Sequence, residues 1–185
     1  MAALEIVKDG HPALKKSAKR IKSMGDDTRK LAEGMIETLR ESGGVGLAAN
    51  QVGVPVRMIA VMHDMDDIRI YVNPRITKFS DEKEYTDEGC LSFPMLYGKV
   101  GRSLKVTVCA QDVNMKNLKL DAEGFLARIF QHETDHLNGI VFTQRAEEGT
   151  LRILEFSEDD EDEESEDSGE NAAADSSEEK DKEAE

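Results

Sequence analysis

The hydrophobic residues of this chain are spaced in two different periods. In residues 28–42, and again from residue 125 to residue 137, apolar side chains recur every three or four positions, which is the spacing of one helix face. Capping residues support both segments. The polar residues 26–28 can cap the first helix. Asp121 can cap the second helix, which would have Glu123 in its first turn. Gly139 is a C-terminal stop for the second segment. The sequence therefore predicts one helix near the N-terminus and another late in the chain.

The remaining apolar runs are short and rich in β-branched residues, which favours strands. They predict strands at residues 56–62, 68–73 and 104–110, with final strands at 140–145 and 151–156. Residues 4–7 are either a short strand or an extended lead-in. A polar turn joins the first two strands as an antiparallel hairpin, and Pro74 ends the second. We expect an α+β fold in which antiparallel β-sheets pack around a central α-helix, the second of the two predicted, with an N-terminal helix as well.

Charge divides the chain into two parts. The 185 residues hold 39 acids and 24 lysines and arginines, for a formal net charge of -15. Residues 157–185 hold 16 of the acids and 2 of the lysines, so residues 1–156 are nearly neutral. We therefore expect a globular catalytic domain over residues 1–156 and a disordered acidic tail over residues 157–185. The charge does not favour binding to DNA.

Features that the sequence lacks indicate the compartment of the protein and the redox state of its cysteines. Cys90 and Cys109 are the two cysteines, too few for a disulfide framework. The N-terminus has no apolar signal segment and shows no transit peptide, and no apolar run is long enough to span a bilayer. These features predict a soluble cytoplasmic protein in a reducing compartment, with no membrane contact.

The second predicted helix carries the sequence Gln131-His-Glu-Thr-Asp-His136. Histidines four residues apart share one helix face, so His132 and His136 can bind the same metal ion. Glu133 lies beside the first ligand and can act as a base on water. The alternative is a helix that carries two histidines by chance, and a third ligand elsewhere would decide between the two.

Cys90 is the candidate third ligand, since a thiolate suits zinc or iron. The alternative for a lone cysteine is a small buried apolar residue, and we expect that of Cys109 because it lies in an alternating strand pattern. Residues 43–53 are rich in glycine and include Gln51, whose amide can donate a hydrogen bond. That segment is either a site wall with a polarising amide or a plain turn before a strand.

Three motifs stand in order along the chain: Gly44-x-Gly-x-Ala-Ala-x-Gln51, Glu88-Gly-Cys-Leu-Ser92 and Gln131-His-Glu-x-Asp-His136. Together they resemble the peptide deformylase family over about residues 1–146. The resemblance implies a hydrolase that removes the formyl group from the N-terminal formylmethionine of newly made polypeptides and releases formate. It also implies one Fe(II) ion per chain, replaceable by Zn(II), Ni(II) or Co(II), held by Cys90, His132 and His136.

The resemblance also assigns roles to other residues. Glu133 is the general base, and the side-chain amide of Gln51 and the backbone N–H of Leu91 stabilise the oxyanion. The substrate site that it implies consists of Val45, Gly46, Gly89, Phe125 and Ile129. The implied partners are formylmethionyl nascent peptides, with the ribosome left open as a further partner, and the expected state is a monomer.

Two rival interpretations remain at this stage: a zinc endopeptidase with the same helix motif, and a non-catalytic metal-binding relative. The motifs around Gln51 and Cys90 argue against the first, and the presence of Glu133 argues against the second. The chain also departs from the family pattern. Met95 stands where many members carry glycine, and residues 151–156 and the acidic tail stand where many bacterial members have a C-terminal helix.

Overall fold

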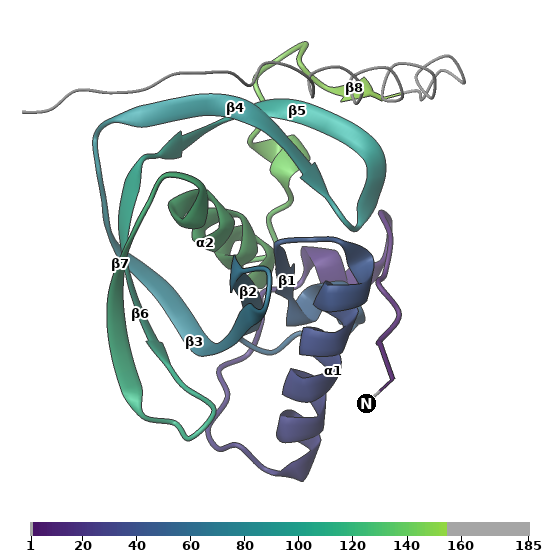
Figure 1. The fold of residues 1–185 in the computed structure, drawn as a ribbon. Coiled ribbons are helices and arrows are strands. Elements are labelled where there is room, and N and C mark those ends of the chain that lie inside the picture. Colours follow the sequence, from purple (N-terminus) through teal and green to yellow (C-terminus); the bar gives the residue numbers. More distant parts are fainter. Residues whose placement is uncertain (1, 155–185) are drawn as a thin grey trace, which may run out of the picture. The chain divides into compact units, whose positions relative to one another are not determined.

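The computed structural model describes residues 2–154 (Figure 1). Its helices are α1 (Asp26–Ser42) and α2 (Gly124–Leu137), with short 3₁₀ helices η1 (Pro12–Lys15), η2 (Ala49–Val52) and η3 (Phe142–Gln144). Its strands are β1 (Gly46–Ala48), β2 (Met58–Asp64), β3 (Asp67–Phe79), β4 (Lys83–Cys90), β5 (Phe93–Ser103), β6 (Lys105–Gln111), β7 (Asn117–Glu123) and β8 (Arg152–Ile153). The predicted domain boundary after residue 156 and the acidic segment 157–185 lie outside the described residues.

Two antiparallel sheets lie around α2 (Figure 1). One has the strand order β1-β2-β3-β6-β7, and the other has the order β4-β5-β8. Every pair of neighbouring strands in them is antiparallel. The predicted α+β class, with antiparallel sheets around a central helix, is confirmed. Of the helices in the described residues, none has the length and apolar character needed to cross a membrane.

Strand β2 shows how the larger sheet is held between the two helices. Ile59 and Val61 belong to the apolar cluster around α2, whereas Met58 and Ala60 belong to the cluster around α1. All four side chains are fully buried. Because successive side chains of a strand point to opposite faces, a strand covered on both sides needs a continuous apolar run rather than an alternating one. The run Met-Ile-Ala-Val at residues 58–61 meets that requirement and fixes α2 against the sheet.

Pro74 does not end the second predicted strand. β3 continues through it to Phe79, and the register with β6 shifts between Val72 and Arg75. Asn73 takes a left-handed φ of 52° at this shift, and its side chain makes hydrogen bonds of 2.9 Å with both backbone groups of Ile21. A bulge leaves one position without a ladder partner, so proline, which has no N–H, is accepted there.

Several predicted element ends are also wrong. α1 begins at Asp26 rather than at residue 28, with two aspartates in its first turn where carboxylates favour the helix dipole. Asp121 does not cap α2: it lies in β7 and accepts a 2.6 Å hydrogen bond from Thr107. The strand predicted at 140–145 is replaced by η3, and the strand predicted at 151–156 is present as the shorter β8. Residues 4–7 form an extended lead-in outside both sheets.

Candidate metal and catalytic site

The three predicted metal ligands come together at the end of β4 and on the inner face of α2. The ligand atoms of Cys90, His132 and His136 all lie within 4.8 Å of one another. The two rings lie one helical turn apart with their centroids 5.0 Å from each other, and Sγ of Cys90 is 3.3 Å from Nε2 of His136. The local i, i+4 spacing gives the histidine pair, while the β4–β5 hairpin brings a sulfur from about forty residues away.

Glu88 supports this cluster and was not assigned a role from the sequence. Its Oε2 lies 3.0 Å from Nδ1 of His132, and Nε and Nη2 of Arg102 donate to its two oxygens at 2.9 and 3.0 Å. Burial by itself would raise the pKa of Glu88, but the bonds from His132 and Arg102 outweigh it and lower the pKa to about 2. A carboxylate that fixes Nδ1 leaves Nε2 free to face a metal, as in carboxylate–histidine–metal arrangements.

The two histidines differ in their surroundings. Burial and the nearby cationic groups lower the pKa of His136 well below its usual range, so its ring is neutral and can bind a metal. Burial also disfavours the charged form of His132, but hydrogen bonds with Cys90 and Glu88 raise its pKa well above the usual range, so a metal at Nε2 would have to displace a proton from that nitrogen. Glu88 thus holds a proton on Nδ1 of His132, whereas Nδ1 of His136 has no partner among the described residues.

Glu133 is a buried carboxyl group with an unused oxygen. Its side chain is 3% exposed, and Oε2 has no hydrogen-bond partner in the described part of the chain. Burial and the negative charge of Glu88 raise the pKa of Glu133 to about 7, although the positive charges of His132 and Arg102 oppose this. A carboxyl group with a pKa near neutrality can both accept and release a proton at physiological pH, which a general acid–base catalyst requires.

The side-chain amide of Gln51 has a fixed orientation beside the cluster. Its Oε1 accepts a 2.8 Å hydrogen bond from the N–H of Ala48, which directs Nε2 the other way. Nε2 then lies 3.3 Å from Oγ of Ser92 and 3.5 Å from Sγ of Cys90. Gln51 is 1% exposed, so its polar atoms must be satisfied inside the protein. The arrangement places an N–H donor next to the candidate ligands.

A cavity of about 560 Å³ opens onto this cluster. Its walls include every residue predicted for the site except His136, which is 1% exposed behind them. The predicted substrate residues that line it are Val45, Gly46, Gly89, Phe125 and Ile129, together with Leu91. Val45 and Phe125 are 38% and 63% exposed, so they lie at the mouth, whereas Ile129 is buried. The cavity therefore joins an apolar wall to the cysteine, histidine and glutamate side chains.

Sequence reasoning missed several residues of this cavity. Lys8 comes from the N-terminal lead-in and Tyr97 comes from β5, whereas Met95, also in β5, was already singled out from the sequence as a departure from the family pattern. Met95 has a left-handed φ of 63°, a backbone conformation in which glycine is unstrained and other residues are rare. Nothing in the local pattern around Lys8 pointed to the site.

Known proteins resemble this chain in sequence. The family model for polypeptide deformylase matches residues 3–151. The chain belongs to the polypeptide deformylase family. A peptide deformylase of Natranaerobius thermophilus is 45% identical over 148 residues, which cover 80% of this chain and 95% of that protein. A peptide deformylase of Desulforudis audaxviator is 41% identical over 146 residues, covering 79% of this chain and 95% of that protein.

Solved deformylase structures have the same fold. The crystal structure of the Thermotoga maritima peptide deformylase aligns with a TM-score of 0.77 at 36% identity, over 80% of this chain and 99% of that one. A Synechococcus elongatus peptide deformylase in complex with actinonin aligns with a TM-score of 0.75 at 36% identity, over 80% of each chain. The chain is therefore a metal-dependent hydrolase that removes the formyl group from N-terminal formylmethionine, as the deformylase motifs predicted.

The residues present fit the metal that a deformylase requires. A thiolate and two imidazoles suit a borderline divalent ion such as iron or zinc. If these three side chains held the ion, one coordination position would stay open, which is typical of a catalytic rather than a structural metal. The buried, unpartnered Oε2 of Glu133 is the polar group that solvent at such a position would satisfy. Chemistry and burial therefore agree on a catalytic metal site.

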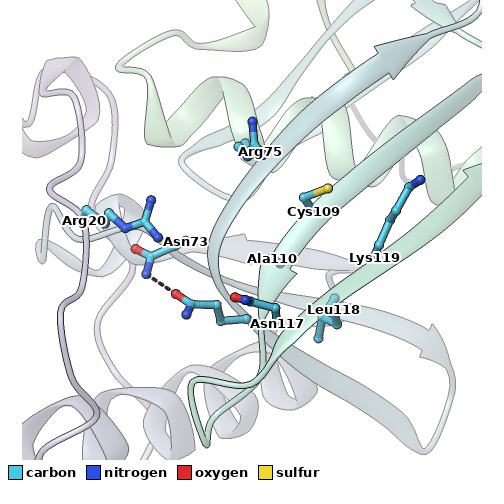
Figure 2. Close-up of a pocket in the computed structure, with 9 residues that line it drawn as sticks. Arg20, Asn73, Arg75, Cys109, Ala110, Asn117, Leu118 and Lys119 are labelled. Carbon is cyan, nitrogen blue, oxygen red and sulfur yellow. Dashed lines mark hydrogen bonds between the residues drawn. The ribbon is translucent and has the colours of Figure 1, made fainter.

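A second cavity of about 570 Å³ lies on the outer face of the larger sheet (Figure 2). Arg75, Cys109 and Lys119 pair across β3, β6 and β7 in one row of this face. Cys109 is half-exposed there, so the prediction that it lies in the core is wrong. The reason is the alternation of β6, in which Val108 and Ala110 point to the core and the residue between them points outward. None of the deformylase motifs reaches this cavity.

Proposed function

We propose that Cys90, His132 and His136 hold the catalytic metal and that Glu133 moves the proton in deformylation. When bound, the divalent ion would act as a Lewis acid and lower the pKa of water from about 15.7 towards about 7. Glu133 takes a proton from the attacking water and then gives it to the leaving amine of methionine. The observation that carries this proposal is the buried, unpartnered oxygen of Glu133 next to the cysteine and histidine cluster.

The oxyanion that forms at the formyl carbon needs hydrogen-bond donors already in place. We assign this role to Nε2 of Gln51 and to the backbone N–H of Leu91. The bond from Ala48 fixes the Gln51 amide, so its donor does not have to reorient during the reaction. Loss of one such donor lowers the rate by roughly 10² to 10³ in acyl-transfer enzymes. Both residues line the cavity, which supports their assignment to the substrate side of the cluster.

The substrate proposal follows the shape of the cavity. The methionine side chain would lie against Ile129, Val45 and Phe125, which together make an apolar wall. Backbone groups of Gly46 and Gly89 lie at the ends of β1 and β4 and can pair with an extended peptide in strand-like fashion. The proposed substrates are nascent formylmethionyl peptides, so we infer that the reaction takes place in the cytoplasm. We also infer that the enzyme is a monomer. The ribosome is a further candidate partner because it supplies these peptides.

Ferrous iron is the metal that we propose, with zinc, nickel or cobalt as substitutes. The thiolate adds negative charge and is a soft donor, and both properties suit Fe(II). They also make the site sensitive to oxygen, since the sulfur of Cys90 and the iron can both be oxidised. Metal analysis of protein purified without oxygen tests this assignment, and zinc as the only metal in active protein would contradict it.

Formate release from formyl-Met-Ala-Ser by anaerobically purified protein tests the proposed function. The matched variant is Glu133→Gln, which keeps the side-chain shape and removes the base. We expect activity in the natural protein and a loss of at least about 10²-fold in the variant, with metal retained, because a positioned acid–base group contributes about 10² to 10⁴. Unchanged formate release by Glu133→Gln, or cleavage of an unblocked internal peptide bond, would contradict the proposal.

A further inference from the structure

The N-terminal lead-in joins two loops that the proposed mechanism needs. Residues 7–9 lie outside both sheets, yet they donate three hydrogen bonds to distant backbone carbonyls. The bonds run from Val7 N–H to Gln51 at 2.8 Å, from Lys8 Nζ to Leu91 at 2.9 Å and from Asp9 N–H to Ser92 at 3.0 Å. We call residues 7–9 the strap. It connects η2, which carries one proposed oxyanion donor, to the β4–β5 turn, which carries the other.

The distance in sequence explains why such a connection matters. Gln51 belongs to η2 and Leu91 to the turn after β4, so 40 positions separate the two donors along the chain, although Nε2 of Gln51 itself reaches Ser92 and Cys90. Oxyanion donors stabilise a transition state only when both meet the same oxygen, and a displacement of about 1 Å can lower a rate about 10²-fold. The strap bonds to Gln51 on one side and to the Leu91–Ser92 turn on the other. It can therefore hold the two donors at a fixed separation.

Of the three hydrogen bonds that the strap donates, only that of Lys8 comes from a side chain. Its ammonium group donates to the carbonyl of Leu91, and hydrogen bonds from a charged donor are stronger than neutral ones. This bond restrains the residue whose N–H is the proposed donor. Lys8 also lines the catalytic cavity although its side chain is exposed. An exposed lysine would otherwise be solvated and free to rotate, so its ordered contact with a site residue calls for a role.

We propose that Lys8 is a positioning residue, which acts through Leu91 to hold the oxyanion donor in place. The inference rests on the proposed function and adds a residue that none of the deformylase motifs contains. Lys8 does not touch the reacting atoms in this proposal. Removing its ammonium group should therefore weaken transition-state stabilisation and leave substrate binding and the metal unchanged.

The test compares Lys8→Met, Lys8→Arg and the control Lys15→Met in the full chain. Lys15 is an exposed lysine of η1, and its side chain makes no hydrogen bond or ion pair among the described residues. We expect Lys8→Met to lower kcat about 10-fold, less than the loss of a whole oxyanion donor, with KM within about 2-fold and the metal content unchanged. Lys8→Arg should restore most of kcat, because arginine can donate to the same carbonyl. Lys15→Met should match the natural protein.

A second readout does not depend on activity. Hydrogen–deuterium exchange of the backbone at residues 90–94 should be faster in Lys8→Met than in the natural protein and unchanged in Lys15→Met. A failure of the proposed function would appear separately, as absence of formate release by the natural protein. The inference about Lys8 is overturned by an unchanged kcat in Lys8→Met, by a loss confined to KM, or by unchanged exchange at residues 90–94.

Discussion

Replacing Glu88 with glutamine should weaken both the fold and the metal site. The substitution keeps the shape of the side chain and removes its charge. It leaves Arg102, Arg128 and His132 facing a neutral amide, with the side chains of Glu88, Arg102 and Arg128 5%, 7% and 8% exposed. Nδ1 of His132 can still donate to the new amide oxygen, so the ring keeps a partner. We therefore expect the substitution to lower the free energy of unfolding and the metal affinity without moving the side chains of the site.

The size of the effect on stability follows from the pKa of Glu88. That pKa is about 2 in the folded protein, against an ordinary value of 4.5. A pKa difference of one corresponds to about 1.4 kcal/mol, so the charged form contributes roughly 3 kcal/mol to stability at neutral pH. Breaking a buried ion pair from one side costs a similar amount, about 3 to 5 kcal/mol. Arg102 keeps its 2.6 Å bond to Asp135, which favours the lower end of that range.

The sign of the pH dependence is also fixed. Because folding lowers the pKa of Glu88, its contribution is complete above about pH 4.5 and disappears as the pH falls towards about 2. Denaturant unfolding of the natural protein and of Glu88→Gln should differ by about 3 kcal/mol near pH 7, and the difference should shrink below about pH 4. Metal affinity, measured by chelator competition near neutral pH, should fall by about 10- to 100-fold.

Glu84→Gln is the matched control, since Glu84 lies on the same strand and pairs with Arg128 at 3.2 Å. Its side chain is 52% exposed, so this pair contributes at most about 1 kcal/mol and should not affect metal binding. Equal losses of stability and metal affinity in the two variants would refute the reasoning, because a buried and an exposed ion pair would then contribute equally. A stability difference for Glu88→Gln that does not shrink in acid would refute the pKa argument.

Two further substitutions test the site geometry. A Cβ at Gly46 would overlap Oε1 of Glu133, so Gly46→Ala should lower formate release by about 10²-fold or more while the protein retains metal. In the control Gly25→Ala the new Cβ meets open space, so formate release should not change. Full activity of Gly46→Ala would mean that Glu133 is not confined as described. Cys90→Ser should lose metal on dialysis against a chelator, and Cys109→Ser should keep it, because Cys90 alone of the two cysteines lies within ligand distance of both histidines; metal loss from both variants alike would contradict the ligand assignment.

The sequence contains most of the chemistry of the site because that chemistry is local. His132 and His136 share a helix face by spacing alone, and Glu133 lies next to the first of them. Cys90 could be assigned to this pair only from its residue type and from the resemblance to deformylases, since the β4–β5 hairpin that delivers it depends on long-range pairing. The fold class followed in the same way from periodicity, which is a property of each segment by itself.

Element ends and supporting residues could not be predicted because other parts of the chain determine them. Pro74 lies within β3 because the bulge beside it is secured by a loop about fifty residues earlier, through the side chain of Asn73. Asp121 does not cap α2 because Thr107 of the neighbouring strand already uses its carboxylate. In both places a local preference gives way to a partner that no sequence window of ordinary length contains.

Glu88 and Lys8 show what this means for reading function from sequence. Each is bonded to a proposed site residue, yet the partners are 44 and 83 positions away. Ligands and bases are recognisable because metal binding and proton transfer demand particular residue types. The residues that orient them need only a charge or a donor at one point in space, which many residue types at many positions can supply. Residues that perform the reaction can therefore be predicted from sequence, whereas the residues that hold them in place require the folded structure.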